Sequence, residues 1–239
     1  IIATFLWLFS LGYLCFAFIA LEHFKYRKNK KVFSGNFSPP VTILKPIYGL
    51  DPDMLNCLRS FCQQDYPRYQ VIFGLQDKND PAIPLVKQVI KEFSDYDISF
   101  IIDIELHGTN HKVSNLINMN PHIKYEYILI ADSDMHVSKK YLTHVMEPFS
   151  NEKVGVITCL YNGKSTSRIA SKLNAMFINT WFLPSVLISH ILQPMKYCLG
   201  ATMIVKRSIL NKIGGFESLS NHLADDYILG KLISSLGYK

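Results

Sequence analysis

Short apolar runs alternate with segments of helical periodicity along most of this chain. Runs of about four to eight apolar residues, bounded by polar ones, are typical of strands buried in a parallel sheet. They predict strands at residues 41–44, 69–75, 98–102, 127–131, 154–160 and 198–205. Helices are predicted at residues 51–64, 81–93 and 138–149 and from residue 224. The alternation indicates an α/β fold with a mostly parallel, Rossmann-like sheet covered by helices on both faces.

Capping residues suggest where two of these helices begin. Asp51 followed by Pro52 combines an N-cap with a proline at the first helical position, so the first helix is expected to start there. Ser138 is expected to cap the helix that runs to about Phe149.

The start of the chain has a different pattern. Residues 1–21 carry no charged side chain and are mostly large and apolar, and about 20 such residues can cross a bilayer. A basic cluster follows, made of Lys25, Arg27, Lys28, Lys30 and Lys31. A signal peptide is the alternative, but its core is shorter and its positive segment comes first. We expect a transmembrane anchor over residues 1–24, a basic juxtamembrane linker over 25–40 and an α/β domain over 41–239, with the basic end in the cytoplasm.

A second apolar segment, residues 169–192, contains Trp181, Phe182 and Pro184 and predicts either an interfacial helix against lipid or a buried core helix.

The net charge of +6 comes largely from the basic cluster, which fits anionic lipid headgroups better than nucleic acid. The five cysteines fit reduced, mostly buried thiols. The chain begins without Met and ends soon after a helical pattern, so we expect it to be a piece of a longer protein.

Two carboxylates follow the apolar run at residues 128–131, in the sequence Asp132-Ser133-Asp134. Ligands of open α/β sheets bind beyond the carboxyl ends of the strands. Mg²⁺ typically takes one or two carboxylates together with substrate phosphates. Asp132 and Asp134 are therefore candidate ligands of a divalent cation, Mg²⁺ or Mn²⁺, next to a phosphate. The alternative is a pair of aspartates that caps the next helix.

Further candidates lie at other strand ends and loops. Gln76 and Asp77 follow the second strand, where a carboxylate could accept hydrogen bonds from a base or ribose or belong to a turn. Lys112 lies near a helix start and could contact a diphosphate. Asp225 and Asp226 either favour the start of a helix through its dipole or supply a general base. Small side chains that would let a substrate approach the backbone, or pack tightly, occur at Gly200, Ala201 and Thr202.

A dehydrogenase is the obvious rival for an alternating α/β chain. Its phosphate loop needs Gly-x-Gly-x-x-Gly after the first strand, whereas residues 45–50 contain one glycine, Gly49. No Walker lysine loop occurs either. Any phosphate must therefore be held by a metal ion and side chains.

Several motifs together resemble glycosyltransferase family 21, which includes ceramide glucosyltransferases. They include Val41-Thr42-Ile43-Leu44-Lys45-Pro46, Phe61-Cys62-Gln63-Gln64-Asp65-Tyr66-Pro67, Lys112-Val113-Ser114-Asn115, Asp132-Ser133-Asp134 and His222-Leu223-Ala224-Asp225-Asp226-Tyr227. The last three are similar to the bacterial branch associated with hopanoid biosynthesis. The match spans nearly everything after residue 40.

This resemblance implies a GT-A fold, a UDP-sugar donor, a divalent cation and inverting transfer of a hexose or N-acetylhexosamine to a lipid hydroxyl, with a hopanoid or ceramide-like acceptor. It implies that Asp77 contacts the uridine, that Asp132 and Asp134 serve nucleotide and metal, and that Asp226, with Asp225 beside it, is the catalytic base. The catalytic domain would lie on the cytoplasmic side of a bacterial inner membrane. The family's Gln-x-x-Arg-Trp motif is expected beyond Lys239.

Two alternatives stay open. The chain could be a catalytically silent, membrane-bound subunit that binds a nucleotide sugar, or a glycosyltransferase of the same fold that acts on a polysaccharide.

Overall fold

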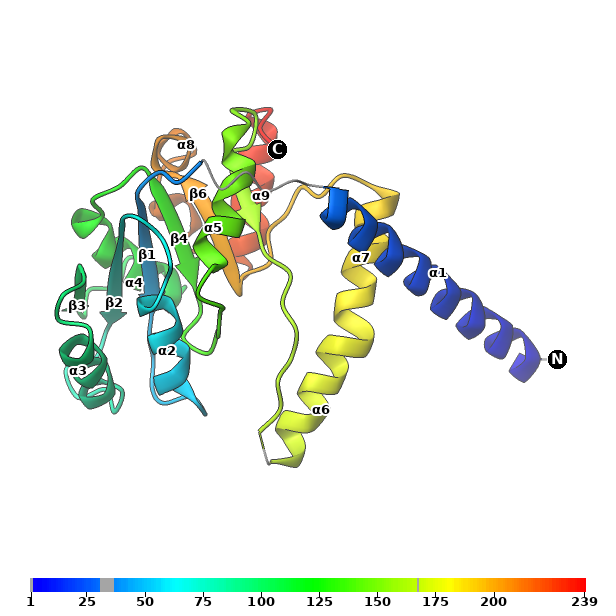
Figure 1. Cartoon of the computed structure of the whole chain (residues 1–239), viewed down its shortest axis with the longest axis horizontal. Coiled ribbons are helices and arrows are strands. Elements are labelled where there is room, and N and C mark those ends of the chain that lie inside the picture. Colours follow the sequence, from blue (N-terminus) through cyan, green and yellow to red (C-terminus); the bar gives the residue numbers. More distant parts are fainter. Residues whose placement is uncertain (1, 31–36, 167) are drawn as a thin grey trace. The chain divides into compact units, whose positions relative to one another are not determined.

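Strands of one mixed sheet organise the larger part of the chain in its computed structural model, which describes residues 2–30, 37–166 and 168–239 (Figure 1). Among these residues the strand order is β3-β2-β1-β4-β6-β5. The strands are β1 (Val41–Pro46), β2 (Tyr69–Leu75), β3 (Ile98–Ile102), β4 (Tyr127–Ala131), β5 (Val156–Thr158) and β6 (Thr202–Lys206). Strands β1 to β4 pair in parallel, whereas β6 is antiparallel to both β4 and β5.

The chain divides into two units. The unit that contains the sheet, here the sheet unit, comprises Ser34–Cys159 and Lys196–Lys239. The other, here the helical unit, comprises Ile1–Phe33 and Leu160–Met195.

Helices cover both faces of the sheet, as the sequence pattern predicts. One core packs against α2 (Met54–Cys62), α3 (Ile83–Glu92) and α5 (Tyr141–Met146), and the other against α4 (His111–Met119), α8 (Arg207–Lys212) and α9 (Asp225–Ser235). Side chains alternate along a strand, so Ile43 of β1 contributes to the first core and its neighbour Leu44 to the second. Both side chains are completely buried.

Strands β2, β3 and β4 have the predicted bounds, but β5 and β6 do not. The strand predicted at 154–160 is reduced to Val156–Thr158, which pairs with β6 alone, and the strand predicted at 198–205 is shifted to Thr202–Lys206. Gly200 and Ala201 therefore lie before the strand rather than in it. Helix α8 was not predicted, because its six residues are too few for a periodic pattern.

The predicted helix starts were too early. Helix α2 begins at Met54 rather than at Asp51, because Asp53 takes the N-cap position with a left-handed backbone, φ 62°. Helix α5 begins at Tyr141, because Ser138 makes a turn in which its carbonyl accepts a hydrogen bond from the Tyr141 amide at 3.0 Å.

Long apolar helices form the helical unit. Helix α1 (Ile2–Lys30) continues beyond the predicted anchor into the basic segment, whereas residues 31–36 of the predicted linker lie outside the described residues. Helix α6 (Ile169–Phe177), a π-helical stretch (Ile178–Phe182) and α7 (Leu183–Leu192) form the second apolar segment. Among the described residues two helices, Ile2–Tyr26 and Ile169–Leu192, are long and apolar enough to cross a membrane, and only 17% of the apolar stretch of the second is buried. Residues 169–192 therefore do not form a buried core helix, which was one of the two interpretations of their sequence.

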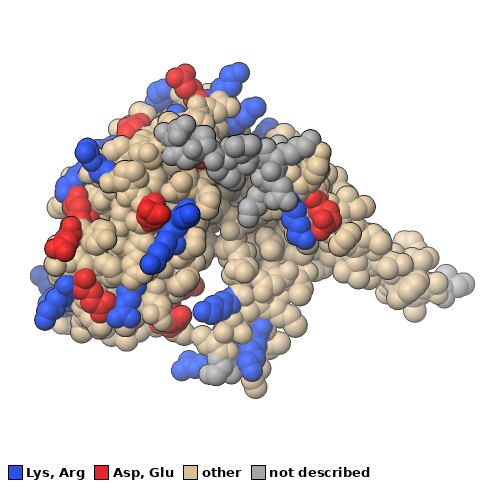
Figure 2. All heavy atoms as spheres, in the orientation of Figure 1, with Lys and Arg blue, Asp and Glu red and all other residues tan. Residues whose placement is uncertain are grey.

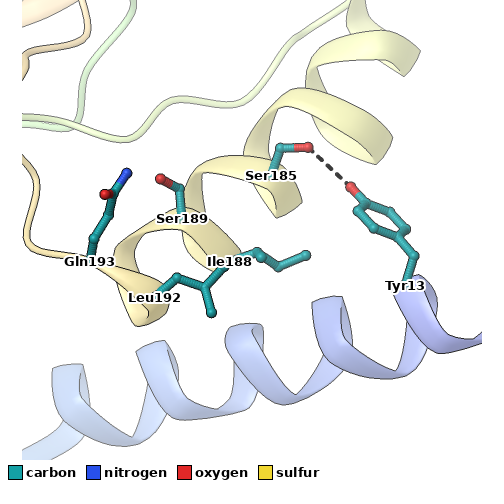
Figure 3. A pocket seen from close by; sticks show the side chains of 6 residues that line it. All are labelled: Tyr13, Ser185, Ile188, Ser189, Leu192 and Gln193. Atoms are coloured by element: carbon teal, nitrogen blue, oxygen red, sulfur yellow. Dashed lines mark hydrogen bonds between the residues drawn. The ribbon is translucent and has the colours of Figure 1, made fainter.

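Polar groups meet within the helical unit, between α1 and α7 (Figure 3). The Tyr13 hydroxyl lies 3.1 Å from the Ser185 hydroxyl, and the Tyr13 ring stacks on Trp181 with centroids 5.4 Å apart. A hollow of about 410 Å³ beside this pair is lined further by Ser189 and Gln193. Each of these half-buried hydroxyls thus has a partner, as apolar surroundings favour.

Charged side chains are distributed differently on the two units (Figure 2). The visible face of the sheet unit carries Lys, Arg, Asp and Glu intermixed, whereas most of α1 presents an uncharged surface. Large apolar side chains such as Phe5, Trp7 and Phe9 are exposed along α1. Such a helix suits a lipid surrounding rather than water.

We predict that Gly230→Ala destabilises the sheet unit. A methyl group at Gly230 of α9 would lie 2.5 Å from the Tyr197 Cα and 2.7 Å from the Cys198 nitrogen, which are backbone atoms that cannot rotate away. The cost should be about 1–3 kcal/mol, more than the gain in helix propensity. Thermal unfolding checks this, with Lys231→Ala at the adjacent exposed position as the control. A melting temperature equal to that of the control would contradict the prediction.

Candidate functional site

The candidate residues gather at the carboxyl edge of the sheet. Strand β1 lies between β2 and β4, and Leu44 aligns with both Ile72 and Ile130. Because all three strands are parallel, the segments after β2 and β4 leave the sheet at the same edge. Asp77 and Asp132 therefore lie at this edge, on opposite sides of β1.

The turn Asp132-Ser133-Asp134 follows β4 and is held through its backbone. The Asp132 amide donates to the Ala201 carbonyl at 3.1 Å, and the fully buried Lys45 ammonium donates to the Asp132 carbonyl. The Cys57 thiol donates to the Asp134 carbonyl at 3.2 Å. The two carboxylates are thereby presented at the edge while their main chain is fixed from the sheet side.

Lys112 contacts both Asp132, a candidate metal ligand, and Gly200, which precedes β6. It lies in the first turn of α4, whose N-cap Asn110 accepts a hydrogen bond from the Val113 amide at 3.1 Å. Its ammonium is 2.5 Å from Asp132 Oδ1 and 3.4 Å from the Gly200 carbonyl. Burial acts to lower the pKa of Lys112, but the charge of Asp132, supported by those of the aspartates of α9, outweighs it and raises the pKa.

Asp225 and Asp226 begin α9 and have different surroundings. Asp225 is buried and its Oδ1 accepts a hydrogen bond from the Asn110 side chain at 3.3 Å. Burial raises the pKa of Asp225, although the charge of Lys112 opposes the shift. Asp226 is half-buried, and its Oδ1 accepts from the Tyr227 amide at 2.8 Å.

The segment before β6 borders Asp226. A Cβ atom on Gly200 would lie 3.0 Å from Asp226 Oδ2, so the absence of a side chain at Gly200 leaves room for this carboxylate. Ala201 is half-buried and Thr202 completely buried, with the Thr202 hydroxyl donating to the Ala201 carbonyl at 2.7 Å. Of the three candidate acceptor-binding residues, Gly200 therefore has a direct geometric relation to the acid pair, and Thr202 is enclosed by protein.

The residues after β2 lie at the same edge but make no contact with the Asp132 turn among the described hydrogen bonds. Asp77 is exposed, and its Oδ1 accepts from the Asn79 amide at 2.8 Å. The Gln76 side-chain nitrogen is buried without a hydrogen-bond partner in the described part of the chain. A buried amide donor without an acceptor costs free energy and would gain from a ligand carbonyl.

The Asp132–Asp134 pair fits a divalent cation only if other ligands complete the shell. No cluster of three or more His, Cys, Asp or Glu side chains with metal-binding geometry occurs among the described residues. Burial raises the pKa of the Asp134 carboxyl, and the nearby negative charges of Asp132 and Asp51 raise it further. Several carboxylates thus lie close together at this turn. Two such oxygen ligands match what Mg²⁺ takes when phosphate oxygens supply the rest.

Sequence reasoning missed Lys45, Asn110 and Asp51 as parts of the site. Asp51 accepts a hydrogen bond from the Ser133 hydroxyl at 2.5 Å, and Asn110 also donates to the His222 carbonyl at 2.8 Å. A signal existed for Lys45, since a charged residue at an inward position of an apolar strand is rare without a partner. The roles of Asn110 and Asp51 depend on contacts between distant segments.

Comparison with known proteins gives a consistent result. The sequence model of glycosyl transferase family 21 matches residues 5–239. The chain is 28% identical over 222 residues to ceramide glucosyltransferase 3 of Caenorhabditis elegans. The aligned region covers 92% of this chain and 48% of that relative. It is 33% identical over 114 residues to a ceramide glucosyltransferase of Candida albicans, covering 43% of this chain and 21% of that protein. The chain thus spans about half the length of the Caenorhabditis relative, and less of the Candida one.

Solved structures share the fold. A mannosyltransferase from Pyrobaculum calidifontis, in complex with GDP-Man and Mn²⁺, superposes with a TM-score of 0.66 at 20% identity over 96% of this chain and 64% of that one. S. aureus TarS superposes with a TM-score of 0.52 at 16% identity, over 81% of this chain and 33% of that one. The sheet and its helices have the GT-A type of fold that the sequence predicts.

We predict that Asp225→Asn changes how stability depends on pH. The folded pKa of Asp225 is raised, so the folded state keeps a proton that the unfolded chain loses above about pH 4. Asp225 therefore costs stability as the pH rises through this window. The melting temperature of Asp225→Asn relative to wild type should rise by a few degrees between pH 3.5 and 7, with Asp95→Asn as the exposed control. A difference that falls with pH would contradict this.

Proposed function

Because this chain belongs to glycosyl transferase family 21, we propose that it transfers a sugar from a UDP-sugar donor to the hydroxyl group of a membrane lipid. The observation that carries the proposal is the contact chain at the carboxyl edge of the sheet. Lys112 binds Asp132 at 2.5 Å and reaches the Gly200 carbonyl at 3.4 Å, and Gly200 in turn borders Asp226. A candidate donor site and a candidate base therefore adjoin one another.

Asp226 suits the role of base better than Asp225 does. A base must reach the proton that it removes. Asp225 is buried and bound by Asn110, whereas Asp226 is half-buried and its Oδ2 accepts no hydrogen bond from the described residues. We assign Asp225 to the support of the first turn of α9, through Asn110 and the charge of Lys112.

The donor would bind across β1. Asp132 and Asp134 would hold a divalent cation, Mn²⁺ or Mg²⁺, which when bound neutralises charge on the leaving diphosphate. Lys112 would contact the same diphosphate, and Asp77 with the unpartnered Gln76 amide would contact the nucleoside. The solved mannosyltransferase of the same fold contains a nucleotide sugar and Mn²⁺, which supports this choice of ligands.

A lipid acceptor is supported by the helical unit and by the relatives. Two helices in the described part of the chain are long and apolar enough to cross a membrane, and the relatives from Caenorhabditis and Candida are both named ceramide glucosyltransferases. We therefore favour glucose as the sugar and a ceramide-like lipid as the acceptor; N-acetylhexosamine and a hopanoid stay predictions from the sequence motifs. The basic cluster that begins at Lys25, after the apolar part of α1, supports a cytoplasmic position for the sheet unit. Location in a bacterial inner membrane likewise stays a prediction.

The chemistry is a direct displacement. The Asp226 carboxylate takes the proton of the acceptor hydroxyl, whose oxygen forms a bond to the anomeric carbon. The bond from that carbon to the diphosphate oxygen breaks, and UDP leaves with the electron pair. Attack from the face opposite the leaving group inverts the configuration, so an α-linked donor yields a β-glycoside. The product configuration is thus fixed by where the base lies.

We predict that Asp226→Asn abolishes sugar transfer and largely spares UDP binding. The amide cannot accept the proton but keeps the size of the carboxylate, and removal of a general base typically costs about 10²–10⁴-fold in rate. Transfer of labelled sugar to extracted lipid measures the first effect, and calorimetry with UDP and Mn²⁺ the second. Glu217→Gln, in the preceding segment, is the matched control.

Retained turnover of Asp226→Asn would exclude this residue as the base. Absence of transfer by the wild-type protein, tested as the full encoded chain in membranes with ceramide-like and hopanoid acceptors, would instead favour a silent nucleotide-sugar-binding subunit.

We also predict that Asp134→Asn weakens UDP binding in the presence of Mn²⁺ and leaves UDP binding in EDTA unchanged. Loss of one of two carboxylate ligands should lower the metal-dependent affinity by roughly tenfold or more, because few protein ligands hold such a cation. Asp95→Asn removes an exposed carboxylate that is not part of the candidate site, and so controls for the change in charge. Equal affinity of wild type and Asp134→Asn with Mn²⁺ would remove Asp134 from the metal site.

A further inference from the structure

We propose that Lys45 is a positioning residue that fixes the turn bearing Asp132 and Asp134, and so determines how tightly a metal–nucleotide complex binds. This inference rests on the proposed function. Lys45 lies near the end of β1, between the two strands whose ends carry the candidate donor site. Its side chain is completely buried and its ammonium contacts the main chain of Asp132, so it would act through the turn and not by touching the ligand.

The Lys45 side chain is among the most enclosed in the protein. It is completely buried, and its ammonium lies 4.0 Å from the centre of the Phe61 ring. Burial lowers the pKa of Lys45 to about 8, although the nearby Cys57 thiol and the carboxylates of Asp132 and Asp134 counteract the shift. An ammonium in such a place carries a desolvation cost that a methionine of similar length would not.

Against this desolvation cost, the Lys45 ammonium makes one hydrogen bond to the main chain. It donates to the carbonyl of Asp132, and the Phe61 ring lies against it as a cation–π partner. The Asp132 carbonyl also accepts from the Met135 amide at 3.3 Å, so it would keep a partner if Lys45 were replaced by an apolar residue. The contact is therefore not needed to satisfy this carbonyl, and its effect is to hold it in place.

Lys45 ties the turn to a strand in the interior of the sheet. Strand β1 is hydrogen-bonded on both sides, whereas the other side-chain tethers of the turn are weaker or nearer solvent. The Cys57 thiol is a weak donor to the Asp134 carbonyl, and the Ser133 hydroxyl reaches Asp51, which is half-buried. Residues that orient the ligands of a metal typically change its affinity by roughly 10–100-fold.

Charge and positioning predict opposite outcomes for Lys45→Met. Removal of a positive charge beneath two carboxylates would, by electrostatics alone, strengthen the binding of a cation. Loss of the tether would weaken it, because the carboxylates would no longer be held at a fixed separation. The direction of the change therefore distinguishes the two effects.

The test uses the full chain in detergent micelles, with UDP and Mn²⁺ as probes in calorimetry. Lys45→Met should bind UDP with Mn²⁺ roughly 10–100-fold more weakly than wild type, bind UDP in EDTA as wild type does, and unfold at the same or a higher temperature. Thr42→Val is the matched control: Thr42 is also buried on β1 and donates to Gln70 at 2.9 Å, but lies at the other end of the strand. It should leave both UDP affinities unchanged.

Two results would overturn the proposal. Unchanged or tighter UDP binding with Mn²⁺ would show that Lys45 does not position the turn. Equal weakening with Mn²⁺ and in EDTA, together with a lower melting temperature, would show general damage to the fold. Failure of the wild-type chain to bind UDP under either condition would instead overturn the proposed function on which this inference depends.

Discussion

The parallel pairing of β1 with both of its neighbours is the constraint on which the rest of the sheet unit depends. The register that aligns Leu44 with Ile72 and Ile130 brings the ends of β2 and β4 to one edge. A parallel pairing cannot be made by a tight turn, so each strand is followed by a helix that returns the chain to the opposite edge. Segments that are distant in sequence, after residues 75 and 131, are thereby placed on either side of one strand.

Electrostatics then organises this edge around two cations with different exposure. Lys112 is half-buried and contacts the Asp132 side chain, whereas Lys45 is enclosed and contacts the Asp132 main chain. Besides burial, the charge of Asp132 raises the pKa of Asp134 and that of Asp226 raises the pKa of Asp225, while Lys45 and Lys112 respectively act in the opposite direction. Of these four acids, Asp132 is bound by the Lys112 side chain and Asp225 by that of Asn110, which leaves the carboxylates of Asp134 and Asp226 less engaged by side chains. These are the residues that the proposed chemistry requires to be available.

The helical unit follows another physical rule. Its helices expose large apolar side chains, and its internal polar groups pair with each other, as the hydroxyls of Tyr13 and Ser185 do. In hydrocarbon an unpaired hydroxyl cannot form a hydrogen bond with water, so pairing within the protein is favoured. The same chain thus contains a sheet unit with charged side chains on its visible face and a helical unit whose surface suits lipid, a combination that agrees with the proposed transfer to a lipid.

The sequence by itself determined the elements that depend on local pattern: strands β2, β3 and β4 at their observed bounds, an apolar first helix, and the abrupt change from apolar residues to Asp132-Ser133-Asp134. Periodicity and burial preference are properties of neighbouring residues, so they can be recognised in one dimension. Tertiary structure alone decided the antiparallel direction of β6 and the contacts of Lys45, Asn110 and Gly200. Each depends on atoms brought together from distant parts of the chain, and no local pattern records which distant atoms those are.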